Sequence, residues 1–108
     1  MASISNPEPN ILRLEGEIDL QESPAVKQHL SRMLETKPER ILIDFTGVKY
    51  IDSSGLAVLI EAMQRVNRYG GRLALFGIHA NVRNIFQISR LDQVFAIYPD
   101  REAAEQEG

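Results

Sequence analysis

An aspartate and two serines stand together in the run Ile-Asp-Ser-Ser-Gly-Leu at positions 51–56. The run precedes the longest amphipathic stretch of the chain, so Asp52, Ser53 and Ser54 should lie at a helix N-terminus. Free backbone N–H groups and the helix dipole favour anions there, and a phosphate attached to either hydroxyl would be partly compensated. The same residue types also cap ordinary helices. Spacing alone therefore favours a simple cap and does not distinguish Ser53 from Ser54.

Other reactive arrangements are missing from the sequence. Position 51 is isoleucine, so the run is no Gly-x-Ser-x-Gly nucleophile motif. The chain has no cysteine and no glycine-rich phosphate loop. Asp44, Asp52 and Glu61 do not form a convincing metal set, and nothing in the sequence links either histidine to Ser53. We therefore expect no enzyme activity, no cofactor and no metal.

Length and charge narrow the class of protein. A chain of 108 residues is long enough for one domain, 1–108, with a modest core. The net charge is −3 with acids and bases mixed, which argues against direct nucleic-acid binding. No segment approaches the roughly 18–20 apolar residues that span a bilayer, and the start resembles no signal peptide. We expect a cytoplasmic protein without membrane insertion.

Hydrophobic periodicity predicts the elements that position the 51–56 run. Strands are expected around Ile4 and over 11–18, 41–45, 72–76 and 94–98, and helices over 23–36, 52–69, 81–89 and 99–106. Two opening strands without an intervening helix imply an antiparallel pair at one edge. Helical crossovers elsewhere imply parallel pairing. The prediction is an α/β (α+β) fold, a mixed sheet of four to five strands with about four helices.

Several local features are also predicted. The first strand should be brief, because the turn-rich segment 6–10 follows it. Ser23, followed by proline, should be the N-cap of the first helix. The segment after the strand at 41–45 should form a turn before the second helix begins. On the exposed side of that helix, Glu61 and Arg65 should form an ion pair one turn apart.

The run at 51–56, with the strand at 41–45 before it, resembles the signature of the STAS domain family. That family includes bacterial anti-sigma-factor antagonists and domains of anion transporters. Leu-Glu-Gly-Glu-Ile-Asp at 14–19 resembles the early strand motif of the family, Gly-Gly-Arg-Leu-Ala-Leu at 70–75 its second glycine-turned strand, and 82–91 its third helix. The resemblance covers nearly the whole chain and implies the STAS fold. It departs from the family at the brief first strand and at Ser89-Arg90, where glycine often follows the serine.

The resemblance implies a partner-switching regulator, an anti-sigma-factor antagonist. Such a protein binds an anti-sigma factor that is also a serine kinase and brings the ATP. The kinase phosphorylates the first serine after the aspartate, here Ser53, and the modified antagonist dissociates until a phosphoserine phosphatase restores it. The implied partner-binding residues are Asp19, Asp52, Ser53, Ser54 and Gly55. The alternative is a STAS subunit that docks onto a membrane transporter complex without phosphorylation.

Overall fold

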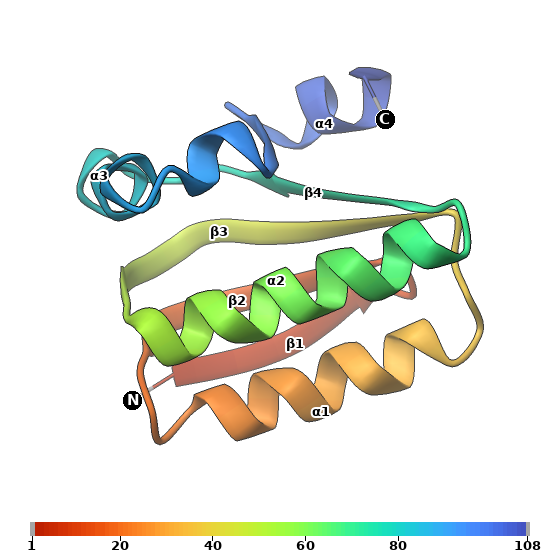
Figure 1. Ribbon diagram of the computed structural model, residues 1–108, viewed down its shortest axis with the longest axis horizontal. Coiled ribbons are helices and arrows are strands. Elements are labelled where there is room, and N and C mark those ends of the chain that lie inside the picture. The colour runs from red at the N-terminus through yellow and green to blue at the C-terminus, as the bar shows by residue number, and fades with distance from the viewer. Residues whose placement is uncertain (1, 108) are drawn as a thin grey trace.

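The computed structural model describes residues 2–107 and shows a mixed sheet with strand order β1-β2-β3-β4-β5 (Figure 1). The first two strands pair antiparallel and all other neighbours pair in parallel. The described elements, in chain order, are β1 (Ala2–Glu8), β2 (Ile11–Ile18), α1 (Ser23–Leu34), β3 (Arg40–Ile51), α2 (Ser53–Arg68), β4 (Arg72–Phe76), α3 (Ala80–Ile88), the 3-10 helix η1 (Leu91–Gln93), β5 (Ala96–Tyr98) and α4 (Arg101–Glu107). The predicted fold class, edge pair and helix number are confirmed.

The two faces of the sheet carry cores of different size. α1 and α2 lie side by side over one face, while α4 lies on the other (Figure 1). Alternation along β2 sends Leu12 and Leu14 into the larger core and Ile11 into the smaller one, which includes Ala104 of α4. The period of two in the sequence therefore reflects one fully buried face of β2, because Arg13 and Glu15 on the opposite face are exposed.

Parallel pairing of β2 and β3 brings two distant loops to the same end of the sheet. Ile18, the last residue of β2, pairs with Ile51, the last residue of β3. The Asp52 N–H then donates to the Ile18 carbonyl at 3.1 Å. The loop that enters α1 therefore lies beside the start of α2.

The first strand and the third are longer than predicted. β1 runs through the segment expected to turn, and only residues 9–10 turn before β2. The expected turn after residue 45 is also wrong, because β3 continues to Ile51. Val48 and Ile51 are buried there and pair with Gly16 and Ile18 of β2. Two register shifts between β2 and β3 accommodate this extension.

The last strand is shorter than expected, because η1 takes residues 91–93 and its Leu91 carbonyl accepts the N–H groups of Val94 and Phe95. Arg90, just before it, has a φ of 60°. That left-handed conformation favours glycine. It falls at the position where the sequence departs from the glycine common in the family.

Candidate functional site

Asp52 caps the N-terminus of α2. Its backbone is extended, and its Oδ1 accepts hydrogen bonds from the N–H groups of Ser54 at 2.9 Å and Gly55 at 3.2 Å. The Ser54 hydroxyl also donates to the same oxygen. That hydroxyl is the main cause that lowers the pKa of Asp52 below its ordinary 3.8; burial opposes the shift, and backbone N–H groups add to it. The site therefore holds an ionised carboxylate at neutral pH.

The two serines, alike in sequence, have different surroundings. The Ser54 hydroxyl is half-buried and lies 2.7 Å from the Ser23 hydroxyl as well as bonding to Asp52. Ser53 is exposed, and its hydroxyl makes no hydrogen bond to the part of the chain whose side chains are described, residues 2–106. Of the two, only Ser53 presents a free hydroxyl at the surface.

Ser23 ties the neighbouring loop to this helix start. The predicted capping role is wrong: Ser23 is the first residue of α1, the N-cap position belongs to Glu22, and neither makes a side-chain cap. Instead Ser23 is 5% exposed, and its hydroxyl donates to the Asp19 carbonyl at 2.8 Å. Proline at the next position sets where the helix begins, so the serine is free to point inward.

Asp19 orders its own loop. Its Oδ1 accepts from the N–H groups of Gln21 at 3.0 Å and Glu22 at 3.2 Å. The resulting chain of contacts runs from Asp19 through Ser23 and Ser54 to Asp52. Two loops that the sequence separates by about thirty residues therefore act as one surface.

Leu20 is the site residue that sequence reasoning missed. Its side chain is 73% exposed although it is large and apolar, and its backbone N–H helps to lower the pKa of Asp52. An exposed apolar side chain inside a polar rim is typical of protein contact surfaces. In the sequence it looks like one more apolar residue at the end of a strand, so only the geometry identifies it.

Gly55 supports the site from below. The residue is buried, and a Cβ there would lie 2.7 Å from Cγ1 of Ile51 and 3.0 Å from Cγ2 of Ile18. The first turn of α2 can therefore sit directly on the ends of β2 and β3 only because position 55 has no side chain. Its contribution to the surface is this close approach and one N–H to Asp52.

The remaining charged candidates lie elsewhere. Asp44 forms an ion pair with Arg13 at 3.1 Å and lies within β3, seven residues before the end of that strand at Ile51. The predicted Glu61–Arg65 pair is wrong, because α1 supplies other partners: Glu61 lies 3.6 Å from Lys27, and Arg65 donates to Ser31. Among the side chains of residues 2–106, no group of three His, Asp or Glu is arranged to hold a metal. None of the helices in that range has the length and apolar character needed to cross a bilayer.

Comparison with known proteins places the chain in a family. A sequence model of the STAS domain family matches residues 3–104. The anti-sigma-B factor antagonist of Listeria monocytogenes serovar 1/2a is 35% identical over 83 residues, covering 76% of this chain and 72% of that protein.

Two solved structures share the fold. The crystal structure of an anti-sigma factor antagonist from Mycobacterium paratuberculosis has a TM-score of 0.85 at 21% identity, covering 99% of this chain and 92% of that one. The Bacillus cell fate determinant SpoIIAA in its phosphorylated form has a TM-score of 0.70 at 19% identity, with both chains fully covered.

Proposed function

The chain belongs to the STAS domain family, and on that basis we propose that it is a one-domain anti-sigma-factor antagonist, residues 1–108, switched by phosphorylation of Ser53. In the unphosphorylated form it binds an anti-sigma factor that is also a serine kinase. Phosphorylation releases that partner, and a phosphoserine phosphatase restores binding. The observation that carries the proposal is the free, exposed hydroxyl of Ser53 beside the ionised Asp52.

The relatives support the regulatory part of this proposal. The Listeria protein at 35% identity is named for antagonism of an anti-sigma factor. SpoIIAA, which has the same fold, has been solved in a phosphorylated form. A subunit that only docked onto a transporter would have no need of a free hydroxyl at the start of α2, so the site favours the antagonist. We place the switch in the cytoplasm, where an ATP-dependent kinase would act.

The chain supplies the acceptor for phosphoryl transfer and nothing else of the chemistry. The Ser53 Oγ attacks the γ-phosphorus of ATP, the bond to the β-phosphate oxygen breaks, and the hydroxyl proton leaves to a base on the kinase. Because Ser54 is held by Asp52 and Ser23, its oxygen is less able to reach a kinase active site. Asp52 fixes the backbone on which Ser53 is presented.

A phosphate on Ser53 would change the surface more than the fold. The Asp52 carboxylate already accepts two N–H groups of the first turn, so the helix start has little left to offer a second anion. The phosphate, with about −1.5 to −2 charges, would extend into water beside an existing negative charge. A partner that covers Leu20 and Ser53 would have to desolvate it. A penalty of roughly 3 kcal/mol, about a hundredfold in affinity, is enough to exchange partners.

Incubation with the cognate anti-sigma factor kinase and ATP, followed by phosphosite mapping, tests the proposal. We expect one phosphate per chain, on Ser53. The Ser54→Ala variant serves as the matched control and should still be modified. Phosphate on Ser54, or no phosphate on a chain that binds the kinase, would overturn the assignment of the site.

A further inference from the structure

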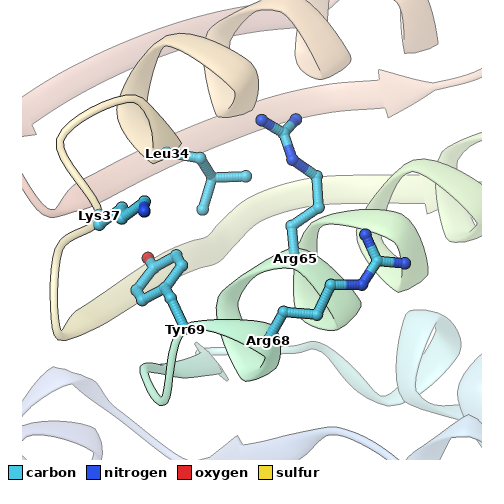
Figure 2. Close-up of a pocket in the computed structure, with 5 residues that line it drawn as sticks. All are labelled: Leu34, Lys37, Arg65, Arg68 and Tyr69. Atoms are coloured by element: carbon cyan, nitrogen blue, oxygen red, sulfur yellow. The ribbon is translucent and has the colours of Figure 1, made fainter.

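A hollow of about 330 Å³ opens near the C-terminal ends of α1 and α2. Its lining residues are Leu34, Lys37, Arg65, Arg68 and Tyr69 (Figure 2). In Figure 2 the Arg65 guanidinium reaches toward α1 and the Lys37 ammonium points toward Leu34, while the Arg68 guanidinium turns away from Lys37. Three of the five lining residues are cations and none is an acid.

The positive charge of this hollow is not neutralised by the described chain. Among the side chains described, those of residues 2–106, no carboxylate forms an ion pair with Lys37, Arg65 or Arg68. Glu61, one turn before Arg65, is taken by Lys27. Arg65 makes one hydrogen bond, 3.1 Å to the Ser31 hydroxyl, and its guanidinium has further N–H donors to offer. This concentration of cations stands out in a chain whose net charge is −3.

The walls of the hollow are fixed in place. The Tyr69 hydroxyl donates to the Pro38 carbonyl at 2.8 Å, which holds the ring against the loop after α1. Burial raises the pKa of Tyr69, and the positive charge of Arg65 partly opposes that shift. Lys37 has a φ of 48°, a conformation that residues with a side chain rarely adopt. Leu34, only 5% exposed, forms an apolar floor.

A structural role accounts for only part of this arrangement. Arg65 and Arg68 lie in the last turn of α2, where cations complement the negative end of the helix dipole. Lys37 lies beyond the end of α1 and belongs to neither helix. Its left-handed backbone belongs to the termination of α1, since its N–H donates to the Leu34 carbonyl at 3.0 Å, but that role does not set the orientation of its side chain toward the hollow.

We propose that this hollow binds a small organic anion, with a carboxylate or phosphate group on a compact apolar body. The head group would take two parallel hydrogen bonds from Arg65 and a charge contact from Lys37. The apolar body would lie between Leu34 and the ring of Tyr69. The volume falls within the range of small-molecule sites.

This site is independent of the Ser53 switch. α2 has 16 residues, so its two ends are about 24 Å apart, and Ser53 lies at the end opposite Arg65 and Arg68. Binding at the hollow can therefore succeed or fail whatever happens at Ser53. The two proposals have separate tests.

Amide NMR titrations with phenyl phosphate and with benzoate test the proposal on the full chain. We expect saturable shifts of the amides at 34–37 and 65–70 with at least one of these probes, and none at 52–56. Inorganic phosphate, which lacks the apolar body, should bind at least about tenfold more weakly. Lys37→Gln and Arg65→Gln should each weaken binding by about tenfold. Lys37 is exposed, so its variant should fold normally even if the loss of Arg65 disturbs the packing.

Arg32→Gln is the matched control. It removes the same charge from an exposed position in the last turn of α1 that does not line the hollow. The Arg32→Gln variant should bind phenyl phosphate and benzoate with the same affinity as the unmodified chain. The proposal is overturned by shifts that do not saturate with either probe, by equal binding of inorganic phosphate, or by an equal loss in Arg32→Gln.

Discussion

Ser53 and Ser54 carry the same functional group on adjacent residues, yet the fold holds the Ser54 hydroxyl in internal contacts and leaves the Ser53 hydroxyl free. The Ser54 hydroxyl lies between the loop before α1 and the start of α2 and donates a hydrogen bond to Asp52. Ser53 is exposed on the first turn of α2. The sequence alone could not separate them, because helix-start spacing suits either residue. The distinction depends on Ser23, the first residue of α1, which contacts Ser54 from 31 residues earlier in the chain.

Exchanging each serine for alanine should separate the two roles. Ser53→Ala should abolish phosphorylation while changing the free energy of unfolding by no more than about 0.5 kcal/mol, because its hydroxyl has no partner to lose. Ser54→Ala should keep the phosphorylation and lose about 1 kcal/mol, because Ser23 and Asp52 each lose a contact. Urea unfolding together with a kinase assay measures both effects. Equal destabilisation by the two variants would contradict these roles.

We expect the free energy of unfolding to depend on the ionisation of Asp52 at acid pH. Its pKa is lowered on folding, mainly by the Ser54 hydroxyl, so the folded state favours the ionised form. Its contribution is therefore complete above its unfolded pKa of about 3.8 and is lost as the pH falls through the folded value.

Asp52→Asn provides the matched comparison, since an amide oxygen can still cap the helix but does not titrate. Urea midpoints measured between about pH 6 and pH 2 should fall less steeply in this variant than in the unmodified chain. Asp44, whose pKa is also lowered, titrates in both proteins, so only the difference between them reports on Asp52. Parallel pH curves would show that the carboxylate has no coupling to the fold.

Elements with a strong local pattern were predictable. The alternation in β2 and the helical spacing in α2 each reflect one buried face, and both were found where expected. The extension of β3 was not, because Thr46-Gly47 looks like a turn. Long-range pairing of Val48 and Ile51 with β2 overrides that local preference. The same pairing sets the position of the first turn of α2. The sequence therefore identified the 51–56 motif but not the residues that surround it.

Gly55 should be required by the contact between α2 and the two strands beneath it. Gly55→Ala should lower the free energy of unfolding by about 1–3 kcal/mol, because the new Cβ meets Ile51 at 2.7 Å. Helix propensity alone predicts the opposite sign, a gain of up to about 1 kcal/mol. Ala57→Gly, at an exposed position on the same helix, measures that propensity separately. A stabilised Gly55→Ala variant would show that the helix can shift without penalty.

The loop before α1 should carry binding energy for the partner. Leu20→Ala should leave the free energy of unfolding within about 0.5 kcal/mol, because 73% of the side chain is exposed. It should weaken the complex with the anti-sigma factor by at least about tenfold, because fully burying a leucine side chain against a partner stabilises by roughly 1.5–3 kcal/mol and truncation loses most of it. Val94→Ala truncates another exposed apolar side chain, near β5 at the opposite edge of the sheet from β1, and is the control. If Leu20→Ala and the unmodified chain bind the anti-sigma factor with equal affinity, Leu20 is not part of the partner-binding surface.

At the scale of the whole molecule, the order of the strands in the sheet brings the two loops of the site together. The strands that lead into the two site loops are neighbours, so Asp19 and Asp52 arrive together although they are far apart in sequence. The family resemblance predicted both residues, since its motifs include them. The resemblance could not predict the chain of hydroxyl contacts between them or the exposure of Leu20, because these depend on the register of β2 against β3.

Phosphorylation should block the partner locally and leave the domain folded. Amide NMR spectra of the free and phosphorylated chains should differ near Asp19–Glu22 and Ser53–Leu56, with the sheet unchanged, because the phosphate faces water. Ser53→Asp, with one negative charge, should show smaller shifts in the same places. Shifts spread through β4 and β5 would point to a conformational mechanism instead.

The most direct test of the switch is the affinity of the kinase partner for the two forms of the chain, measured by calorimetry in the absence of ATP. The unphosphorylated protein should bind, and the Ser53-phosphorylated protein should bind about a hundredfold more weakly, which corresponds to roughly 3 kcal/mol. Equal affinity of the two forms would contradict partner switching through Ser53.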